Sequence, residues 1–598
     1  MGDTTRFSAL RNSQALFLVR IIMHNYFRFG IFESLLSFSS SKPMLRRPFL
    51  RYFLLFVLTF LGSQVGMAQD RYAVFFKYKP QQEFSLANPS QFLTSKALQR
   101  RDREKLALDS LDLPVAASYL QGIRPAIVEL LYSSKWLNAA VVVADTTGKK
   151  WMEALPYVEK VNWIAKGFIP KEGNRQFSQI LNPWEVDSFS KWEIEENYRQ
   201  AEAYDFQNHL LGIEKMHQAG FTGKNRTIAI FDSGFPGMDT ISAFAPVFKN
   251  KQLVGQLNVV RPWIKGVFRD HEHGTQVASL ILAYQPGSLV SGAYGAKIIL
   301  ATTEDVTSEY PIEEFNWVRA AEYADSLGVD IINSSLGYLD FDEPSLTYSN
   351  SQLDGKTTFI SRGATIAGKK GILVVTSVGN YGSAGGSSLV APADAAGILS
   401  VGAVTSTAAV AAFSSRGPTA DGRTKPELAA FGQNAVVIRP SGQVVAVSGT
   451  SFSAPQITAL AAGLWEARPD WTKEELLNNL FQSGSQYTSP DQNLGYGIPN
   501  FREALYGALL GVTEEEVNGT LIYPNPIIST NLFIQVGNDT RLFFQLRDGL
   551  GRLIFEKMAE RQSSNVPYQI DLPVLATGIY LIQASDSNEI VTKKLIKR

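Results

Sequence analysis

The chain has 598 residues, which is too long for one ordinary core and predicts three or more folding units besides processing segments. Its 56 Lys and Arg balance its 56 Asp and Glu, so net charge favours neither nucleic acid, nor an anionic membrane, nor an acidic substrate. No cysteine is present, which excludes disulfides, thiolate metal sites and cysteine catalysis.

A secretory signal peptide is predicted at residues 44–68. Three arginines precede an apolar run from 52 to 61, and small residues follow up to Ala68, after which we expect cleavage. A membrane anchor is the alternative, but the apolar run is short for a bilayer. Because the signal begins at Met44, residues 1–43 are expected to be a mis-assigned N-terminal extension; a long signal with an unusual preface is the alternative.

A small mixed domain is predicted at residues 69–164. An apolar strand at 72–78 precedes a charged helical stretch at 95–108, and a second strand at 137–145 leads into a further helix. The following segment, 165–203, is polar and irregular, and we expect it to be a linker or activation region.

Residues 204–510 alternate short apolar runs with longer stretches that fit helices. Buried strands separated by helices indicate a parallel sheet covered on both faces, the α/β class. Beyond this region, residues 511–598 change to short alternating strands broken by Gly, Asn and Asp, which predicts a small β-sandwich. The α/β runs are RTIAIF (226–231), AKIILATT (296–303), VDIINSSL (329–336), GILVVTSV (371–378) and GILSVGAV (397–404).

Two candidate catalytic residues follow from their positions on these elements. Asp232 ends an apolar run, so it lies at the carboxyl end of a buried strand, where α/β sheets place functional groups; a turn or cap is the alternative. His273 precedes a helical pattern, and a helix start disfavours the imidazolium, which suits a general base. His271 and His273 flank a carboxylate and offer a metal site as the alternative, but they lack the i, i+4 spacing of helix-borne zinc ligands.

A hydroxyl and an amide complete the candidate site. Ser451 lies between a Gly-Thr turn and a helix-forming run, where free N–H groups can stabilise negative charge; ordinary N-capping is the alternative. Asn380 closes a buried run and could donate to an oxyanion, or form a turn.

The ordered motifs resemble those of the subtilisin-like serine proteases, peptidase family S8. The order Asp, His, Ser agrees, and the resemblance extends from about 208 to 508. The motifs are IAIFDSGF (228–235), HGTQVAS (273–279), VDIINSSLG (329–337), VTSVGN (375–380), APADAAGILSVGAV (391–404), FSSRGPTADGRTKPELAAFG (413–432) and SGTSFSAP (448–455).

The resemblance implies a subtilisin-like fold and roles for individual residues. Ser451 would be the nucleophile, His273 the base and Asp232 its orienting carboxylate, with Asn380 in the oxyanion hole. Substrate would bind as an added strand beside Ser335, Leu336 and Gly337, with Val378 and Gly379 on the opposite wall. The sequence departs from the family's pattern at Tyr338, where glycine is common, and in a polar insertion at 341–358.

The flanking regions resemble other parts of secreted subtilases. The segment 69–164 is similar to their prodomain, an α+β ferredoxin-like fold that assists folding and inhibits the enzyme until it is removed. The segment 511–598 is similar to the sorting domain of type IX secretion, which implies a Bacteroidetes-type bacterium, passage through the periplasm and across the outer membrane, and removal of the tail; a surface-adhesion sandwich is the alternative. The C-terminal matches are IYPNP (522–526), DGLGR (548–552), LPVLATGIYLI (572–582) and KKLIKR (593–598).

The expected activity is that of a secreted or surface-attached endopeptidase that cleaves proteins and peptides. The chemical step requires no cofactor; structural calcium occurs in the family, but the sequence displays no clear ligand cluster. A catalytically silent scaffold that binds at the cell surface is the rival hypothesis.

Overall fold

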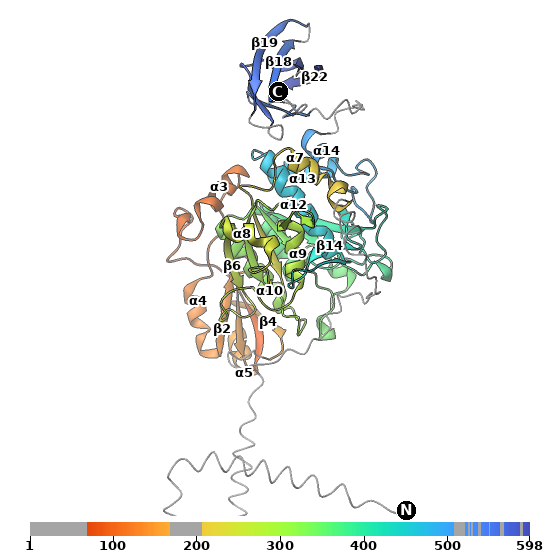
Figure 1. Ribbon diagram of the computed structural model, residues 1–598. Coiled ribbons are helices and arrows are strands. Elements are labelled where there is room, and N and C mark those ends of the chain that lie inside the picture. The colour runs from red at the N-terminus through yellow and green to blue at the C-terminus, as the bar shows by residue number, and fades with distance from the viewer. Residues whose placement is uncertain are drawn as a thin grey trace, which may run out of the picture. The chain divides into compact units, whose positions relative to one another are not determined.

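The computed structural model describes residues 69–167, 206–507, 521–523, 525, 527, 530–535, 540–548, 551–561, 567–585 and 590–597. The predicted signal peptide and N-terminal extension lie outside these residues, as does most of the predicted linker. Figure 1 gives the order of the elements along the chain.

The central region is built on a seven-stranded sheet in the order β13-β12-β11-β10-β5-β9-β6. All its neighbouring strands pair in parallel, which confirms the predicted α/β class. The strands are β5 (Thr227–Asp232), β6 (Leu253–Asn258), β9 (Lys297–Thr302), β10 (Ile331–Ser334), β11 (Leu373–Ser377), β12 (Leu399–Val404) and β13 (Leu428–Phe431).

Each face of this sheet is covered, because successive side chains of a strand point to opposite faces. In β5, Ile228 and Ile230 belong to one core cluster, whereas Ala229 and Phe231 belong to another. The first cluster includes α9 (His273–Leu282), α12 (Thr450–Ala467) and α13 (Lys473–Gln482); the second includes α10 (Ile312–Leu327) and α11 (Phe359–Lys369). Helices α9 and α12 lie side by side in Figure 1.

Shorter elements complete the central region. The helices are α7 (Ile213–Gln218), α8 (Ala245–Lys249) and α14 (Phe501–Tyr506). Two antiparallel hairpins pair β7 (Tyr284–Gln285) with β8 (Leu289–Val290), and β14 (Ala435–Ile438) with β15 (Val444–Val447). The 3-10 turns are η4 (Ser242–Phe244), η5 (Pro344–Leu346), η6 (Asn350–Gln352) and η7 (Gly382–Ala384), of which η5 and η6 lie in the polar insertion at 341–358.

The N-terminal region is a four-stranded antiparallel sheet in the order β2-β3-β1-β4, which confirms the predicted α+β domain. The predicted helix at 95–108 ends at Arg103, and Lys105 adopts a positive φ of 54°, which a continuing helix does not allow. The elements are β1 (Asp70–Phe76), η2 (Pro89–Gln91), α3 (Ser95–Arg103), α4 (Ala117–Gly122), η3 (Arg124–Ala126), β2 (Glu129–Ser134), β3 (Ala139–Ala144), α5 (Thr146–Glu153) and β4 (Val158–Ala165).

The C-terminal region consists of two antiparallel sheets, β16-β17-β20 and β19-β18-β21-β22. Side chains from both sheets, including Ile534, Phe544, Ile570 and Ile582, form one core cluster, as expected of a small sandwich. The strands are β16 (Leu521–Tyr523), β17 (Asn531–Gln535), β18 (Arg541–Asp548), β19 (Leu553–Glu560), β20 (Tyr568–Asp571), β21 (Gly578–Ser585) and β22 (Ile590–Lys597).

Candidate active site

The candidate residues gather where neighbouring strands of the parallel sheet end. Asp232 is the last residue of β5, Ser335 follows β10, and Asn380 comes shortly after β11. These three strands are adjacent in the sheet and parallel, so their carboxyl ends share one edge. This is the edge at which open α/β sheets bind ligands.

Asp232 and His273 form a hydrogen-bonded pair at this edge. Nδ1 of His273 lies 2.9 Å and 3.0 Å from the two carboxylate oxygens of Asp232. The Asp232 side chain is fully buried, and its Oδ1 also accepts from the backbone N–H of Ser233 at 2.8 Å. The carboxylate therefore fixes the imidazole with Nδ1 toward it, which leaves Nε2 on the opposite side of the ring.

Gly274 allows this pair to form. A Cβ at this position would lie 2.2 Å from the carbonyl oxygen of Gly234 and 2.8 Å from Cβ of Asp232. Any larger residue would push the start of α9 away from the end of β5. The glycine after the histidine is therefore required by the close approach of two backbones.

Ser451 lies in the first turn of α12, as the sequence predicted for its local structure. Its Oγ donates to the carbonyl oxygen of Ser335 at 3.1 Å, and Oγ of Ser335 donates in return to the carbonyl oxygen of Ser451 at 2.8 Å. The ring of the next residue, Phe452, lies with its centroid 5.7 Å from that of His273. The start of α12 is thus joined to the end of β10 and lies beside the imidazole.

Pro455 explains why the Ser451 carbonyl is available to Ser335. Within a helix, that carbonyl would accept from the N–H four residues later, but proline has none. The hydroxyl of Ser335 occupies the freed position. Pro455 lies inside the motif at 448–455, but nothing in the motif indicated this role.

Asn380 is held by the residue that precedes Ser451. Its Oδ1 accepts from both the backbone N–H and the hydroxyl of Thr450, each at 3.0 Å. The same hydroxyl oxygen lies 3.2 Å from the carbonyl oxygen of Gly379 and accepts from the Gly379 N–H at 3.3 Å, and Gly379 has a φ of 110° that favours glycine. Because the oxygen of the Asn380 amide is engaged, its NH₂ group is the part available to another acceptor.

The candidate substrate-binding residues lie on two segments, residues 335–337 after β10 and residues 378–379 after β11. Residues 335–337 follow β10 without belonging to a strand, and the side chains of Ser335 and Leu336 are buried and half-buried. Val378 is fully buried in the second core cluster, so only its backbone can face a ligand. Tyr338 is also buried, and its hydroxyl donates to Glu304.

Three glutamates that sequence analysis did not single out lie close together beyond the end of β9. Glu304, Glu309 and Glu313 each offer a carboxylate oxygen, and these oxygens lie within 4.8 Å of one another. Burial raises the pKa of Glu304 to about 7, while burial and the neighbouring carboxylates raise the pKa values of Glu309 and Glu313 well above the ordinary value. Among the described residues, this grouping contains neither His271 nor His273.

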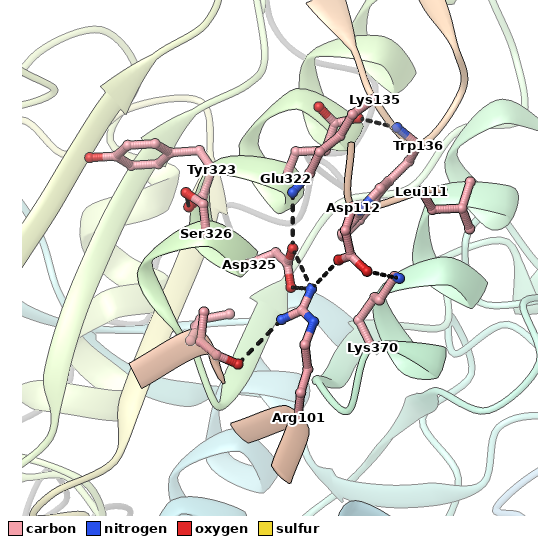
Figure 2. A network of polar contacts seen from close by, with 12 residues as sticks. Arg101, Leu111, Asp112, Lys135, Trp136, Glu322, Tyr323, Asp325, Ser326 and Lys370 are labelled. Carbon is pink, nitrogen blue, oxygen red and sulfur yellow. Dashed lines mark hydrogen bonds and ion pairs between the residues drawn. The ribbon is translucent and has the colours of Figure 1, made fainter. Parts of the chain in front are cut away.

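A buried network of charges joins the N-terminal domain to the central one (Figure 2). Arg101 lies 2.6 Å from Asp112 and 3.0 Å from Asp325, and Lys370 lies 2.8 Å from Asp112. Asp325 also accepts from Arg100 at 2.5 Å. Every cation on Asp325 comes from the N-terminal domain, with Lys135 completing the set at 3.1 Å.

One face of the N-terminal sheet adds apolar contacts to this network. Phe75 of β1 packs against Phe315 of α10 and Phe359 of α11, with ring centroids 6.0 Å and 5.6 Å apart. Further along, Arg71 donates to the carbonyl oxygen of Lys166 at 3.0 Å, so the segment leaving β4 is fastened beside β1. The N-terminal domain is thus docked through a hydrophobic face and buried ion pairs.

In the part of the chain that the structure describes, none of the helices combines the length and apolarity needed to cross a bilayer.

Three segments match known families. Residues 223–497 match the Subtilase family, residues 71–178 match the Peptidase S8 propeptide domain of Bacteroidota, and residues 521–598 match the Secretion system C-terminal sorting domain. The matches fall on the α/β, α+β and antiparallel β regions, respectively.

Curated relatives agree with the first match. Subtilisin of Bacillus pumilus is 28% identical over 299 residues, which cover 48% of this chain and 94% of the relative. Serine protease AprX of Bacillus subtilis is 26% identical over 320 residues, covering 48% of this chain and 67% of the relative. Among solved structures, MycP1 with the N-terminal propeptide removed is 21% identical with a TM-score of 0.41, and the match covers 52% of this chain and 99% of MycP1.

The sorting domain indicates that the protein acts outside the cell or on its surface. With its motifs, its parallel sheet and the three family matches taken together, residues 223–497 form a serine peptidase domain of the Subtilase family, and the chain also carries a Bacteroidota propeptide and a C-terminal type IX secretion sorting domain.

Proposed function

We propose that the protein is a secreted endopeptidase that cleaves peptide bonds through Asp232, His273 and Ser451. The observation that carries the proposal is the hydrogen bond between the buried carboxylate of Asp232 and the imidazole of His273, located at the sheet edge beside the first turn of α12. A carboxylate, an imidazole and a hydroxyl from separate elements are the groups that acyl transfer requires.

In the proposed reaction, Oγ of Ser451 attacks the carbonyl carbon of the scissile bond. Nε2 of His273 takes the hydroxyl proton and gives it to the departing amine, so the peptide bond breaks and an acyl-enzyme remains. A water molecule then attacks the carbonyl carbon of the acyl-enzyme, His273 again takes and returns a proton, and the carboxylic acid product is released. Asp232 keeps the imidazole in the required tautomer and stabilises the imidazolium during each transfer.

The oxyanion would be stabilised by the side-chain NH₂ of Asn380 and the backbone N–H of Ser451. Thr450 supports this role because it binds the oxygen of the Asn380 amide, which turns the NH₂ group away from Thr450. A donor held in place before the reaction stabilises the developing charge without reorganisation.

Substrate would extend along the backbone of residues 335–337, with the backbone of Val378 and Gly379 opposite. This mode depends on main-chain hydrogen bonds and accepts varied side chains. Because Tyr338 replaces the common glycine and its side chain is buried against Glu304, it would alter the shape of the wall beyond Gly337.

The N-terminal domain would act as an intramolecular inhibitor that is released by cleavage within residues 165–203. Its support is the buried network of Arg100, Arg101 and Lys135 around Asp325, together with the hydrophobic face on α10 and α11. The chemical step would use no cofactor. The sorting domain would engage the type IX secretion machinery and be removed afterwards, and the remaining domain boundaries would be those predicted, with the catalytic domain at 204–510.

The test is labelling by a serine-directed fluorophosphonate after the N-terminal domain has been removed. We expect labelling and casein hydrolysis by the wild type, and loss of both in Ser451→Ala. The matched control is Ser448→Ala, which removes an exposed hydroxyl three residues earlier and should retain both. If the activated wild type is not labelled, the catalytically silent scaffold is correct instead.

A further inference from the structure

We propose that Glu304, Glu309 and Glu313 form a calcium site beside the candidate active site. The three residues come from the loop after β9 and the first turn of α10. These residues lie outside the proposed catalytic set, so a calcium ion at this site does not depend on the catalytic roles proposed above.

The spacing of the carboxylates fits a calcium ion. Their oxygens lie within 4.8 Å of one another. Calcium binds oxygen at about 2.3 to 2.6 Å, so ligands on opposite sides of one ion are about 4.6 to 5.2 Å apart. Zinc and copper favour nitrogen or sulfur ligands, whereas a set made only of carboxylates suits a hard cation.

A second observation comes from the buried carboxylate of Glu313, whose side chain belongs to a residue that is only 2% exposed. Its Oε1 accepts from the backbone N–H of Asp305 at 2.7 Å, but its Oε2 is buried and has no hydrogen-bond partner. A buried carboxylate oxygen without a donor is costly, and a cation bound between the three glutamates would satisfy it.

The surroundings neutralise the cluster only in part. The Arg71 guanidinium of the N-terminal domain lines the same cavity as Glu313, and burial lowers the pKa of Arg71 while the charge of Glu313 acts in the smaller, opposite direction. Among the described residues, none of the three glutamates forms an ion pair with Lys or Arg. Arg261 pairs instead with Asp270 and Asp305, and the Arg71 guanidinium donates to the carbonyl oxygen of Lys166. A divalent ion would supply the missing charge.

The raised pKa values of the cluster are consistent with this reading. Burial is the main cause for each group, and the proximity of the other carboxylates raises the pKa values of Glu309 and Glu313 further. Groups that are forced toward the neutral form by burial and mutual repulsion become ionised when a cation binds between them.

The site would join three parts of the active-site wall. Glu304 accepts from the hydroxyl of Tyr338, and its neighbour Thr303 donates its backbone N–H to the carbonyl oxygen of Asp232 at 3.0 Å. Glu309 is bound to Asp342, which donates its N–H to the Glu309 carbonyl at 3.0 Å. Calcium would therefore fasten the loop after β9 to the β5 end and to the insertion at 341–358.

The experiment uses the full chain carrying Ser451→Ala, which prevents self-digestion. Calcium is removed with a chelator and added back, and the unfolding of the catalytic domain is followed by calorimetry. At a hundredfold excess of calcium over its Kd, we expect the melting temperature to rise by about 5 °C. Terbium, used as a luminescent substitute for calcium, should show tyrosine-sensitised emission because Tyr338 contacts Glu304.

Two variants and a control decide the assignment. Glu313→Gln, made in the same Ser451→Ala chain, should lose at least four fifths of the rise in melting temperature on adding calcium and of the terbium emission. If Glu313→Gln does not fold, Glu309→Gln is used in its place, with the same expected result. The control is Glu314→Gln, because Glu314 is also buried but is bound by Tyr348 and the N–H of Ile360 and lies outside the cluster. An unchanged melting temperature on adding 10 mM calcium, or a shift that persists in both cluster variants, would overturn the proposal.

Discussion

Asp325→Asn should weaken the docking of the N-terminal domain on the catalytic domain. The Asp325 side chain is fully buried and accepts from Arg100, Arg101 and Lys135, all of which belong to the N-terminal domain. Burial alone would raise the pKa of Asp325, but these cations outweigh it and lower the pKa from 3.8 to about 2. The substitution removes the charge that the three cations share.

The magnitude follows from that pKa difference. Each pKa unit corresponds to about 1.4 kcal/mol, so the ionised carboxylate favours the docked state by about 2.5 kcal/mol. Because the docked pKa is the lower one, this contribution is present above about pH 4, where the undocked carboxylate is ionised, and is lost as pH falls toward 2. Breaking a buried pair typically costs about 3 to 5 kcal/mol, so we expect a loss of about 3 kcal/mol and a Kd about a hundredfold higher at pH 7.

The assay is inhibition of the activated enzyme by the separately produced N-terminal domain, residues 69–167. The inhibition constant of the Asp325→Asn enzyme is compared with that of the wild type, and the melting temperature of each activated enzyme shows whether the variant is folded. As a control, Glu153→Gln in the inhibitor breaks the exposed ion pair with Lys149 and should change the constant less than threefold. A change below threefold in folded Asp325→Asn would refute the reasoning, because the buried network would then contribute nothing to docking.

Three further substitutions test the site and its surroundings. Asn380→Ala should lower kcat by about two to three decades, the loss known for an oxyanion-hole asparagine of a subtilisin, and steady-state kinetics would measure it. The melting temperature should fall by no more than a few degrees. Gly274→Ala should reduce kcat at least a hundredfold, since its Cβ would meet the Gly234 carbonyl and Asp232; an active variant would show that the close approach is not needed. Burial raises the pKa of Glu314 in the folded protein to about 7, so the wild type loses stability as pH rises from 4.5 through 7. Because Gln does not titrate, Glu314→Gln should avoid this loss, and between pH 5 and pH 8 its free energy of unfolding should fall by about 3 kcal/mol less than that of the wild type. Denaturant curves that shift equally with pH in both proteins would contradict this.

Sequence patterns predicted the parallel sheet because five of its seven strands, β5, β9, β10, β11 and β12, lie in apolar runs; β6 (Leu253–Asn258) and β13 (Leu428–Phe431) were not among these runs, and β6 is interrupted by Gly255 and Gln256. The same patterns placed Asp232 at a strand end and Ser451 at a helix start. They could not predict the end of the N-terminal helix at Arg103, since the charged residues after it are themselves good helix formers and the chain turns at Lys105 instead.

Contacts between distant segments could not be predicted from the sequence, for a different reason. Glu304, Glu309 and Glu313 are separated by five and four positions, and only the last lies on a helix, so no helical period brings them together. Their proximity depends on the path of the loop after β9. In the same way, Arg101 and Asp325 are 224 positions apart and are joined only by docking of two domains.

Helix α10 thus carries a buried charged residue near each of its two ends. At its first turn, Glu313 is buried among other carboxylates with one oxygen unpartnered, and near its last turn Asp325 is buried among three cations. Among the described residues, the glutamates of the first arrangement form no ion pair with Lys or Arg, whereas the carboxylate of the second would lose its ion pairs only after the N-terminal domain departs. If maturation removes that domain, Asp325 becomes exposed to water and needs no replacement partner. The first turn changes too, because Arg71, Leu131 and Tyr132 of the N-terminal domain line the same cavity as Glu313. After their departure the proposed calcium ion would be the positive charge left beside Glu313, while the ion pairs at the last turn serve only the docked state.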